Sequence, residues 1–221
     1  VDYLMVGSVT IAGSRVQVNL RLVRTRDGLA VLKEVQEGEY PDGIFDLQDT
    51  LAKAAVDSMK LTLSSLEKRN LAKAPTRDIP AFELYNKSLG AKRGEDRIAL
   101  LRKALDRDPA FSQAAHLLAD MYVDAGRPDE ALAVYRGIID RDPADYRACY
   151  NGALLSFDAG GIRQAALWMN RCREINDTDP AVSYHLGLFA EYGTDGTRLG
   201  EGCDLEAASD WYRAAVRLDP G

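Results

Sequence analysis

Two histidines, His116 and His185, are the residues whose chemistry best suits proton transfer or metal binding. Each lies in a segment with helical periodicity, and neither has a second histidine four residues away or a Cys/His cluster around it. A zinc site needs three or four such ligands, and a general base needs a partner that orients it. We therefore expect no catalytic residue and no metal site, and we interpret both histidines as groove-lining or solvent-facing.

Three cysteines offer thiol chemistry, but they form no CxxC motif and so predict no zinc site and no disulfide framework. Cys149 and Cys172 fall on two consecutive predicted helices and could approach each other. We interpret both as small core residues, and a disulfide between them stays open if the protein is exported. We expect Cys203, in a Gly-rich loop, to be the exposed thiol.

The Gly-rich stretch GTDGTRLGEG, at residues 193–202, has the composition of a phosphate-binding loop. It lacks the Lys-Ser/Thr pair that holds phosphate and magnesium, and it follows a predicted helix rather than a strand. We interpret it as a loop insertion. No GxSxG motif and no paired-carboxylate arrangement is present. The sequence therefore predicts a protein that is not an enzyme and that needs no cofactor.

Charge and hydropathy narrow the class of partner. The 221-residue chain has a net charge of -6, and residues 1–75 are neutral, with 10 Lys+Arg against 10 Asp+Glu. The whole net negative charge thus lies in residues 76–221, and an acidic surface repels phosphates, which argues against a nucleic-acid partner. No apolar run approaches the length of a membrane span, so none is expected. These features favour a protein or peptide partner.

The segment RDPA occurs at residues 107–110 and again at 141–144, 34 positions later, and each copy closes an apolar run. Between the copies, residues 112–124 and 129–140 show helical periodicity. The intervening AGRP ends one helix and starts the next, since Gly adopts the left-handed terminal conformation and Pro suits a first turn. The residues expected to face inward are Ala115, Leu118, Ala119, Tyr122, Ala131, Tyr135 and Ile138.

This unit resembles the tetratricopeptide repeat (TPR), a helix–turn–helix of 34 residues. Ala119, Ala131 and Pro143 match the small and Pro positions of the family, whereas Ile138 replaces a small residue. Ala153 and Ala165 hold the small positions of the next unit, in which Met169 and Cys172 are expected to face the core. The last unit, with the swollen turn EYGTDGTRLGEGCD, resembles a Sel1-type variant. We expect a TPR array at 78–221, with about four repeats at about 80–109, 112–143, 146–180 and 181–220.

The first part of the chain is strand-like at residues 3–11, 15–25 and 29–40, where the middle segment alternates apolar and polar residues. Asp27-Gly28 is a dipeptide typical of a tight hairpin. A helix is expected at about 45–69. Its apolar stripe consists of Leu47, Leu51, Ala55, Val56, Met59, Leu63 and Leu66.

These strands and this helix, placed before a TPR array, resemble the carboxy-terminal half of the TolB-like amino-terminal domain. In bacterial proteins that domain often follows an adenylate cyclase, a protein kinase or a DNA-binding module. The resemblance covers about residues 2–69 and implies a partial TolB-like α/β domain at 1–72, truncated so that one sheet edge is unpaired. The fold class expected is α+β: a three-strand antiparallel sheet plus helix, followed by an all-α TPR superhelix.

In TPR arrays the first helix of each repeat lines a concave face, and the resemblance implies that four positions of each such helix point into it. Aromatic and aliphatic groups flanked by single charges suit a peptide or a helix in a groove. The Lys/Asn set that clamps a terminal carboxylate in chaperone-binding TPRs is not reproduced. The expected partner-binding residues are Gln113, His116, Asp120, Val123, Arg147, Tyr150, Leu154, Phe157, Tyr184 and Leu188.

Three functions fit these observations. The first is a non-enzymatic interaction scaffold; the second is a regulatory or sensor segment of a larger bacterial signalling protein; the third is a periplasmic envelope assembly or secretion factor. Both the bacterial cytoplasm and the periplasm stay open. Because the chain begins with Val1 and ends directly after a Pro, we expect a longer parent protein. We also expect self-association through the open sheet edge or the last repeat.

Overall fold

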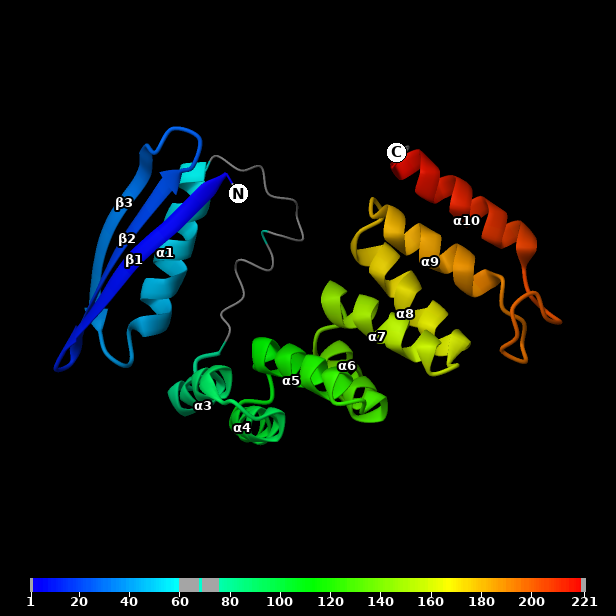
Figure 1. Cartoon of the computed structure of the whole chain (residues 1–221), viewed down its shortest axis with the longest axis horizontal. Coiled ribbons are helices and arrows are strands. Elements are labelled where there is room, and N and C mark those ends of the chain that lie inside the picture. The colour runs from blue at the N-terminus through cyan, green and yellow to red at the C-terminus, as the bar shows by residue number, and fades with distance from the viewer. Residues whose placement is uncertain (1, 60–67, 69–75, 220–221) are drawn as a thin grey trace. The chain divides into compact units, whose positions relative to one another are not determined.

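The computed structural model describes residues 2–59, 68 and 76–219, and the chain divides into two compact units, 1–79 and 80–221. Over the described residues, three strands are followed by nine helices (Figure 1). The expected α+β class is confirmed. Among the described residues, the first unit contains the sheet with a helix packed against it, and the second unit consists of helices joined by loops.

The sheet is antiparallel with the order β1-β2-β3, formed by β1 (Tyr3–Ala12), β2 (Arg15–Arg24) and β3 (Ala30–Glu39). These bounds agree with the predicted strands to within a residue. The second hairpin turns at Gly28, whose φ of 69° lies in the left-handed region that favours glycine. The hairpin predicted from Asp27-Gly28 is therefore confirmed.

Helix α1 (Ile44–Met59) packs mainly against β3 and also against β2. Its residues Leu47 and Leu51 form a small core with Val16 of β2. The predicted continuation of this helix, with Leu63 and Leu66, lies outside the described residues. Strand β1, at the sheet edge, leaves most of its large apolar side chains exposed.

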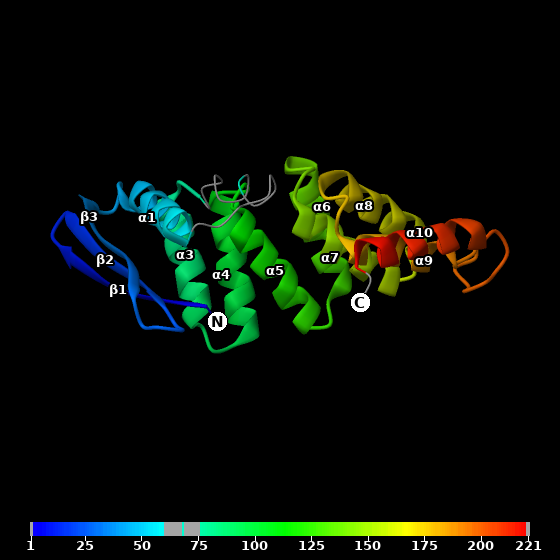
Figure 2. The same cartoon turned by 90° about the horizontal axis from the view of Figure 1, so that it is seen from above.

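The second unit is built from four consecutive pairs of helices, which follow one another in chain order (Figure 2). We call the first helix of each pair the A helix and the second the B helix. The pairs are α3 (Ile79–Gly90) with α4 (Gly94–Arg107), α5 (Ser112–Asp124) with α6 (Pro128–Arg141), α7 (Tyr146–Asp158) with α8 (Ile162–Ile175), and α9 (Pro180–Ala190) with α10 (Leu205–Leu218).

Small residues let the helices of a pair approach closely. Ala119 and Ala131 have no exposed surface, and every residue predicted to face inward in α5 and α6 is buried. Ile138, the departure from the family pattern, is buried as well. The core clusters run across consecutive pairs, so each pair buries apolar surface against the next. This continuity is the serial stacking of a TPR superhelix.

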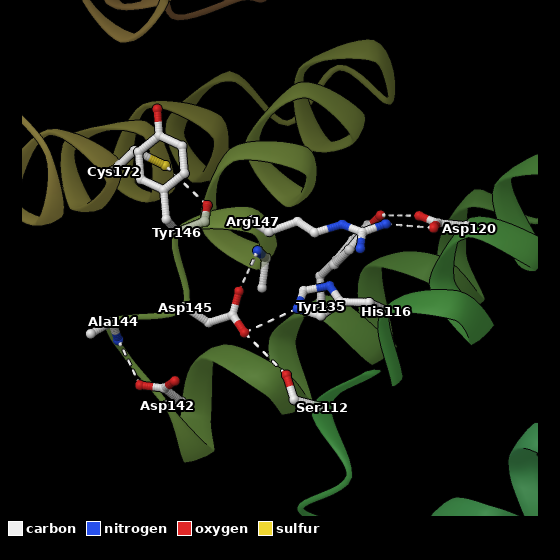
Figure 3. A network of polar contacts seen from close by, with 11 residues as sticks. Ser112, His116, Asp120, Tyr135, Asp142, Ala144, Asp145, Tyr146, Arg147 and Cys172 are labelled. Carbon is white, nitrogen blue, oxygen red and sulfur yellow. Dashed lines mark hydrogen bonds and ion pairs between the residues drawn. The ribbon is translucent and has the colours of Figure 1, made fainter. Parts of the chain in front are cut away.

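Aspartate residues link one A helix to the next (Figure 3). Asp145, the N-cap of α7, accepts a hydrogen bond from the backbone N–H of Ala148 at 2.9 Å. Its other oxygen lies 3.3 Å from Oγ of Ser112 and 3.0 Å from Nε2 of His116, both on α5. One carboxylate therefore caps α7 and ties it to the preceding A helix.

The same arrangement recurs 34 residues later. Asp179 caps α9 by accepting from the N–H of Ala181 at 2.9 Å, and the hydroxyl of Tyr146, on α7, donates to its other oxygen. Burial, followed by this hydrogen bond to Asp179, raises the pKa of Tyr146. Equivalent aspartates therefore join each of two A helices, α7 and α9, to the A helix before it.

Candidate protein-binding groove

A cavity of about 340 Å³ lies where the C-terminal ends of α5 and α7 meet α6. We call it the α5–α7 groove. Its volume lies at the lower end of the range for small ligand pockets, which suits one or two side chains of a partner. The lining residues are Asp120, Val123, Asp124, Tyr135, Asn151, Leu154, Leu155 and Asp158.

Three of the residues predicted from the sequence, Asp120, Val123 and Leu154, line this groove together. Asp120 and Leu154 are 34 residues apart, so they hold equivalent places in two repeats. Nη2 of Arg147, another predicted residue, lies 2.6 Å from Oδ2 of Asp120 (Figure 3). The groove therefore has an aliphatic wall and one carboxylate already matched by a cation.

Tyr135, which lies on α6, also lines the α5–α7 groove. Its ring is buried, and its hydroxyl lies 3.5 Å from Oδ1 of Asp120. Burial, with the negative charge of Asp120 as the next cause, raises the pKa of Tyr135. The tyrosine therefore keeps its proton and presents no negative charge of its own.

An aromatic row continues from α7 toward the last repeat. The ring of Tyr150 stacks on that of Tyr146 with centroids 5.9 Å apart and on that of His185 with centroids 5.6 Å apart. Tyr184 lies 5.4 Å from His185 and 5.7 Å from Tyr212 of α10. Burial lowers the pKa of His185. The predicted residues Tyr150 and Tyr184 thus belong to one ring system, with His185 between them.

Two other predicted residues, Phe157 and Leu188, are half-buried and pack against the core of the last two pairs. The ring of Phe157 stacks on Phe189 at 4.7 Å and meets the ring of Tyr192 edge-on at 4.9 Å. Both side chains contribute mainly to the contact between α7 and α9.

The remaining predicted residues, Gln113 and His116, differ sharply in exposure. Gln113 is exposed on α5. We expected His116 to line a groove or to face solvent, but only 7% of it is exposed, because its ring is packed into the helix pair and bonded to Asp145. His116 therefore contributes to the joint between two A helices.

Sequence reasoning missed Asp124, Asp158 and Asn151 as groove residues. A signal for the two aspartates was present: they are 34 residues apart, and each is the last residue of its A helix. The TPR resemblance instead implied the preceding residues, Val123 and Phe157, for the concave face. The ends of α5 and α7 line one groove because both helices pack against α6.

The expected approach of Cys149 and Cys172 is confirmed, since both side chains lie in one buried cluster and each thiol shifts the pKa of the other. Both are free thiols without exposed surface. The interaction between the two thiols lowers the pKa of Cys149 and raises the pKa of Cys172, which burial raises further. Sγ of Cys172 also lies 3.8 Å from the carbonyl oxygen of Tyr146.

The Gly-rich stretch forms a folded loop between α9 and α10, with an isolated bridge between Tyr192 and Arg198. Nε of Arg198 lies 2.6 Å from Glu191, and the hydroxyl of Tyr212 donates to Glu191 at 2.9 Å. Arg198 first, and then Tyr212, lowers the pKa of Glu191. Burial, followed by the hydrogen bond to Glu191, raises the pKa of Tyr212 to about 12. The loop is thus held by its own ion pair.

A metal site and a membrane span are both absent from the described part of the chain. Residues 2–59, 68 and 76–219 contain no cluster of three or more His, Cys, Asp or Glu side chains that could hold a metal ion. Within the same ranges, no helix combines the length and the apolar character that crossing a bilayer requires.

Comparison with known proteins supports the repeat assignment. Residues 89–153 match the family model of the tetratricopeptide repeat. A search of curated protein sequences gave no match. The sequence resemblances of the first unit to a TolB-like domain, and of the last repeat to a Sel1-type repeat, stay predictions.

Solved structures of MamA share the fold. The chain is 14% identical to residues 41 to the end of MamA from Desulfovibrio magneticus RS-1, with a TM-score of 0.51 over 81% of this chain and 95% of that one. It is 18% identical to MamA of AMB-1, with a TM-score of 0.53 over 80% and 90% of the two chains. Residues 89–153 therefore match the tetratricopeptide repeat family, and the chain shares the fold of these MamA structures.

Proposed function

We propose that the chain is a non-enzymatic scaffold that binds a segment of a protein partner along its A helices. The observation that carries the proposal is the α5–α7 groove, in which side chains from equivalent places in two repeats line one cavity. TPR proteins are interaction modules as a class, so the fold and the groove point to the same kind of function.

The exposed apolar side chains of the A helices supply a reason for a partner to bind. Val123 is 44% exposed and Tyr184 is 50% exposed, although both lie among packed helices. Covering such surface yields about 25 cal/mol for each Å² of apolar area removed from water. A peptide or an amphipathic helix laid along a groove covers several side chains of this kind at once.

Substitution of Val123 tests this proposal. Val123→Glu places a charge in the α5–α7 groove at an exposed site, so the fold should tolerate it. The full chain, tagged, would be used to capture partners from a lysate, and the affinity of each partner would then be measured by calorimetry. We expect Val123→Glu to weaken binding about ten-fold or more, because a carboxylate must be desolvated against aliphatic side chains.

Leu167→Glu is the matched control, since Leu167 is 63% exposed but lies on α8, a B helix. It should leave partner affinity unchanged. Equal binding by the parent chain and the Val123→Glu variant would show that partners bind elsewhere. The regulatory-segment and envelope-factor hypotheses stay predictions from the sequence.

A further inference from the structure

The α5–α7 groove carries negative charge that is not matched by a cation. Asp124 and Asp158 line it from the last residues of α5 and α7. Neither forms an ion pair or a side-chain hydrogen bond within the described residues. Asp120, by contrast, already faces the guanidinium of Arg147 at 2.6 Å. The groove thus holds two carboxylates without a positive partner.

The helix ends add to this negative potential. The C-terminal end of a helix has unpaired carbonyls and a partial negative charge, so it favours cations and disfavours carboxylates. Neither α5 nor α7 has a basic residue in its last turn. Each B helix does follow the favourable pattern, with Arg107, Arg141, Arg173 and Arg217 in its last turn. The A helices α5 and α7 therefore end in acidic residues, although basic residues at these positions would stabilise the helices better.

The apolar lining restricts the kind of cation that fits. Val123, Leu154 and Leu155 give the groove an aliphatic wall below the two carboxylates. A hydrated metal ion or a small amine would leave that wall in water. A long side chain with an apolar stem and a cationic head can cover the wall and also reach the carboxylates. Lys and Arg are the residues with this form.

We propose that the α5–α7 groove takes a Lys or Arg side chain of the partner segment, with an aliphatic residue beside it. The stem lies on Val123 and Leu154, and the head group lies between Asp124 and Asp158. This inference rests on the proposed function, because it names the chemistry that the same groove recognises. The partner segment is accordingly basic and apolar, complementary to the acidic array.

Selection from a random-sequence peptide library displayed on phage tests the inference with the full chain. The parent chain should enrich peptides in which Lys or Arg adjoins an aliphatic residue. Asp124→Asn/Asp158→Asn keeps the shape of the groove and removes its charge, so it should select peptides without that enrichment. For one enriched peptide, Lys→Met should weaken binding to the parent about ten-fold and leave binding to the Asn variant nearly unchanged.

The matched control is Asp106→Asn/Asp140→Asn. These two aspartates are exposed, 34 residues apart and located on the B helices α4 and α6, so the change in net charge is identical. The control should retain the Lys/Arg enrichment. If both double variants lost the Lys/Arg enrichment, the enrichment would depend on the net charge of the array and not on the groove. That result would overturn the inference.

The remaining outcomes separate this inference from the proposed function. If the parent selects peptides without Lys/Arg enrichment, and Val123→Glu abolishes selection, the groove binds peptides but the cationic specificity is wrong. If the parent selects nothing, or if Val123→Glu selects the same peptides as the parent, the proposed function fails together with the inference.

Discussion

Cys149 and Cys172 show how one residue contact depends on the packing of two helices. They lie on α7 and α8, 23 positions apart, and their thiols lie in one core cluster where neither residue has exposed surface. Alkylation requires a thiolate that a reagent can reach. Burial denies access to both sulfurs, and the raised pKa of Cys172 also keeps that thiol protonated.

We therefore predict that iodoacetamide adds to one cysteine in the folded protein and to all three in denaturant. Intact mass spectrometry counts the adducts directly. Cys203, which is partly exposed in the loop before α10, is the expected site, so Cys203→Ser should give a folded protein with no adduct. Rapid labelling of Cys149 in the folded chain would contradict the burial argument.

His185 should make stability depend on pH. Burial lowers its pKa below the usual 6.5, and its Nδ1 is buried without a hydrogen-bond partner in the described structure. Between the folded pKa and 6.5 the unfolded chain therefore binds the proton more readily than the folded chain. The free energy of unfolding should consequently fall as pH drops below 6.5 and should be fully present above it.

His185→Phe should weaken this pH dependence, because a Phe ring can keep the contacts with Tyr150 and Tyr184 but binds no proton. Urea unfolding midpoints of the variant and the parent chain, measured from above pH 6.5 downward, check the prediction. As the pH falls, the urea midpoint of His185→Phe should rise relative to the midpoint of the parent chain. An unchanged difference at every pH would show that His185 is equally basic in both states.

Residue-level interpretations from the sequence succeeded where the cause was local. The inward-facing residues of α5 and α6 could be predicted because helical periodicity alone determines which positions share a face. His116 could not be placed, because its burial depends on Asp145, which lies 29 residues away in the next repeat.

At the scale of the element, glycine determines how closely the helices of a repeat can pack. A Cβ on Gly152 would lie 2.8 Å from the ring of Trp168 and 3.3 Å from Cβ of Tyr135, which is too close for side chains confined to the core. Gly137 is a contrasting helical glycine, because a Cβ there would meet only the flexible end of Arg141 at 3.2 Å.

We predict that Gly152→Ala lowers the free energy of unfolding by about 1–2 kcal/mol, since overpacking outweighs the gain in helix propensity. Gly137→Ala makes the same chemical change in α6 and should raise that free energy by about 0.5–1 kcal/mol. Urea denaturation followed by circular dichroism measures both. If both variants were stabilised, α7 and α8 would pack less tightly than the structure indicates.

The type and order of the elements could be predicted because each was encoded over a short window. The alternation of apolar and polar residues indicated β2. Gly and Pro at the helix ends, together with Ala residues that face inward, indicated the helix pairs. The shape of the loop between α9 and α10 could not be predicted in the same way. It depends on the pairing of Arg198 with Glu191, which turn residues alone do not specify.

At the scale of the whole molecule, the two units have separate cores. The cluster around Val16, Leu47 and Leu51 belongs to the first unit, and the larger clusters belong to the helical array. The small sheet has an edge strand with exposed apolar residues, including Val9 and Ile11. Such an edge offers both unpaired backbone groups and apolar surface to another chain.

We predict that the protein self-associates in a concentration-dependent way and that Val9→Lys reduces the association. A lysine on an edge strand is a known protection against edge-to-edge pairing, because its charge is costly to bury. Sedimentation velocity over a range of concentrations measures the effect. Val216→Lys, at an exposed site on α10, tests the last repeat as the other predicted contact. A parent chain that sediments only as a monomer would refute both.

The sequence alone determined the type and order of the elements that the structure describes, because periodicity, small residues and turn residues act within one repeat. It also argued against a nucleic-acid partner, since net charge is a sum over residues, and that interpretation stays a prediction. Only the tertiary structure brought Asp124, Asp158 and Leu154 to one groove and His116 against Asp145. These contacts depend on the angle and distance between helices, which the packing of many side chains decides together.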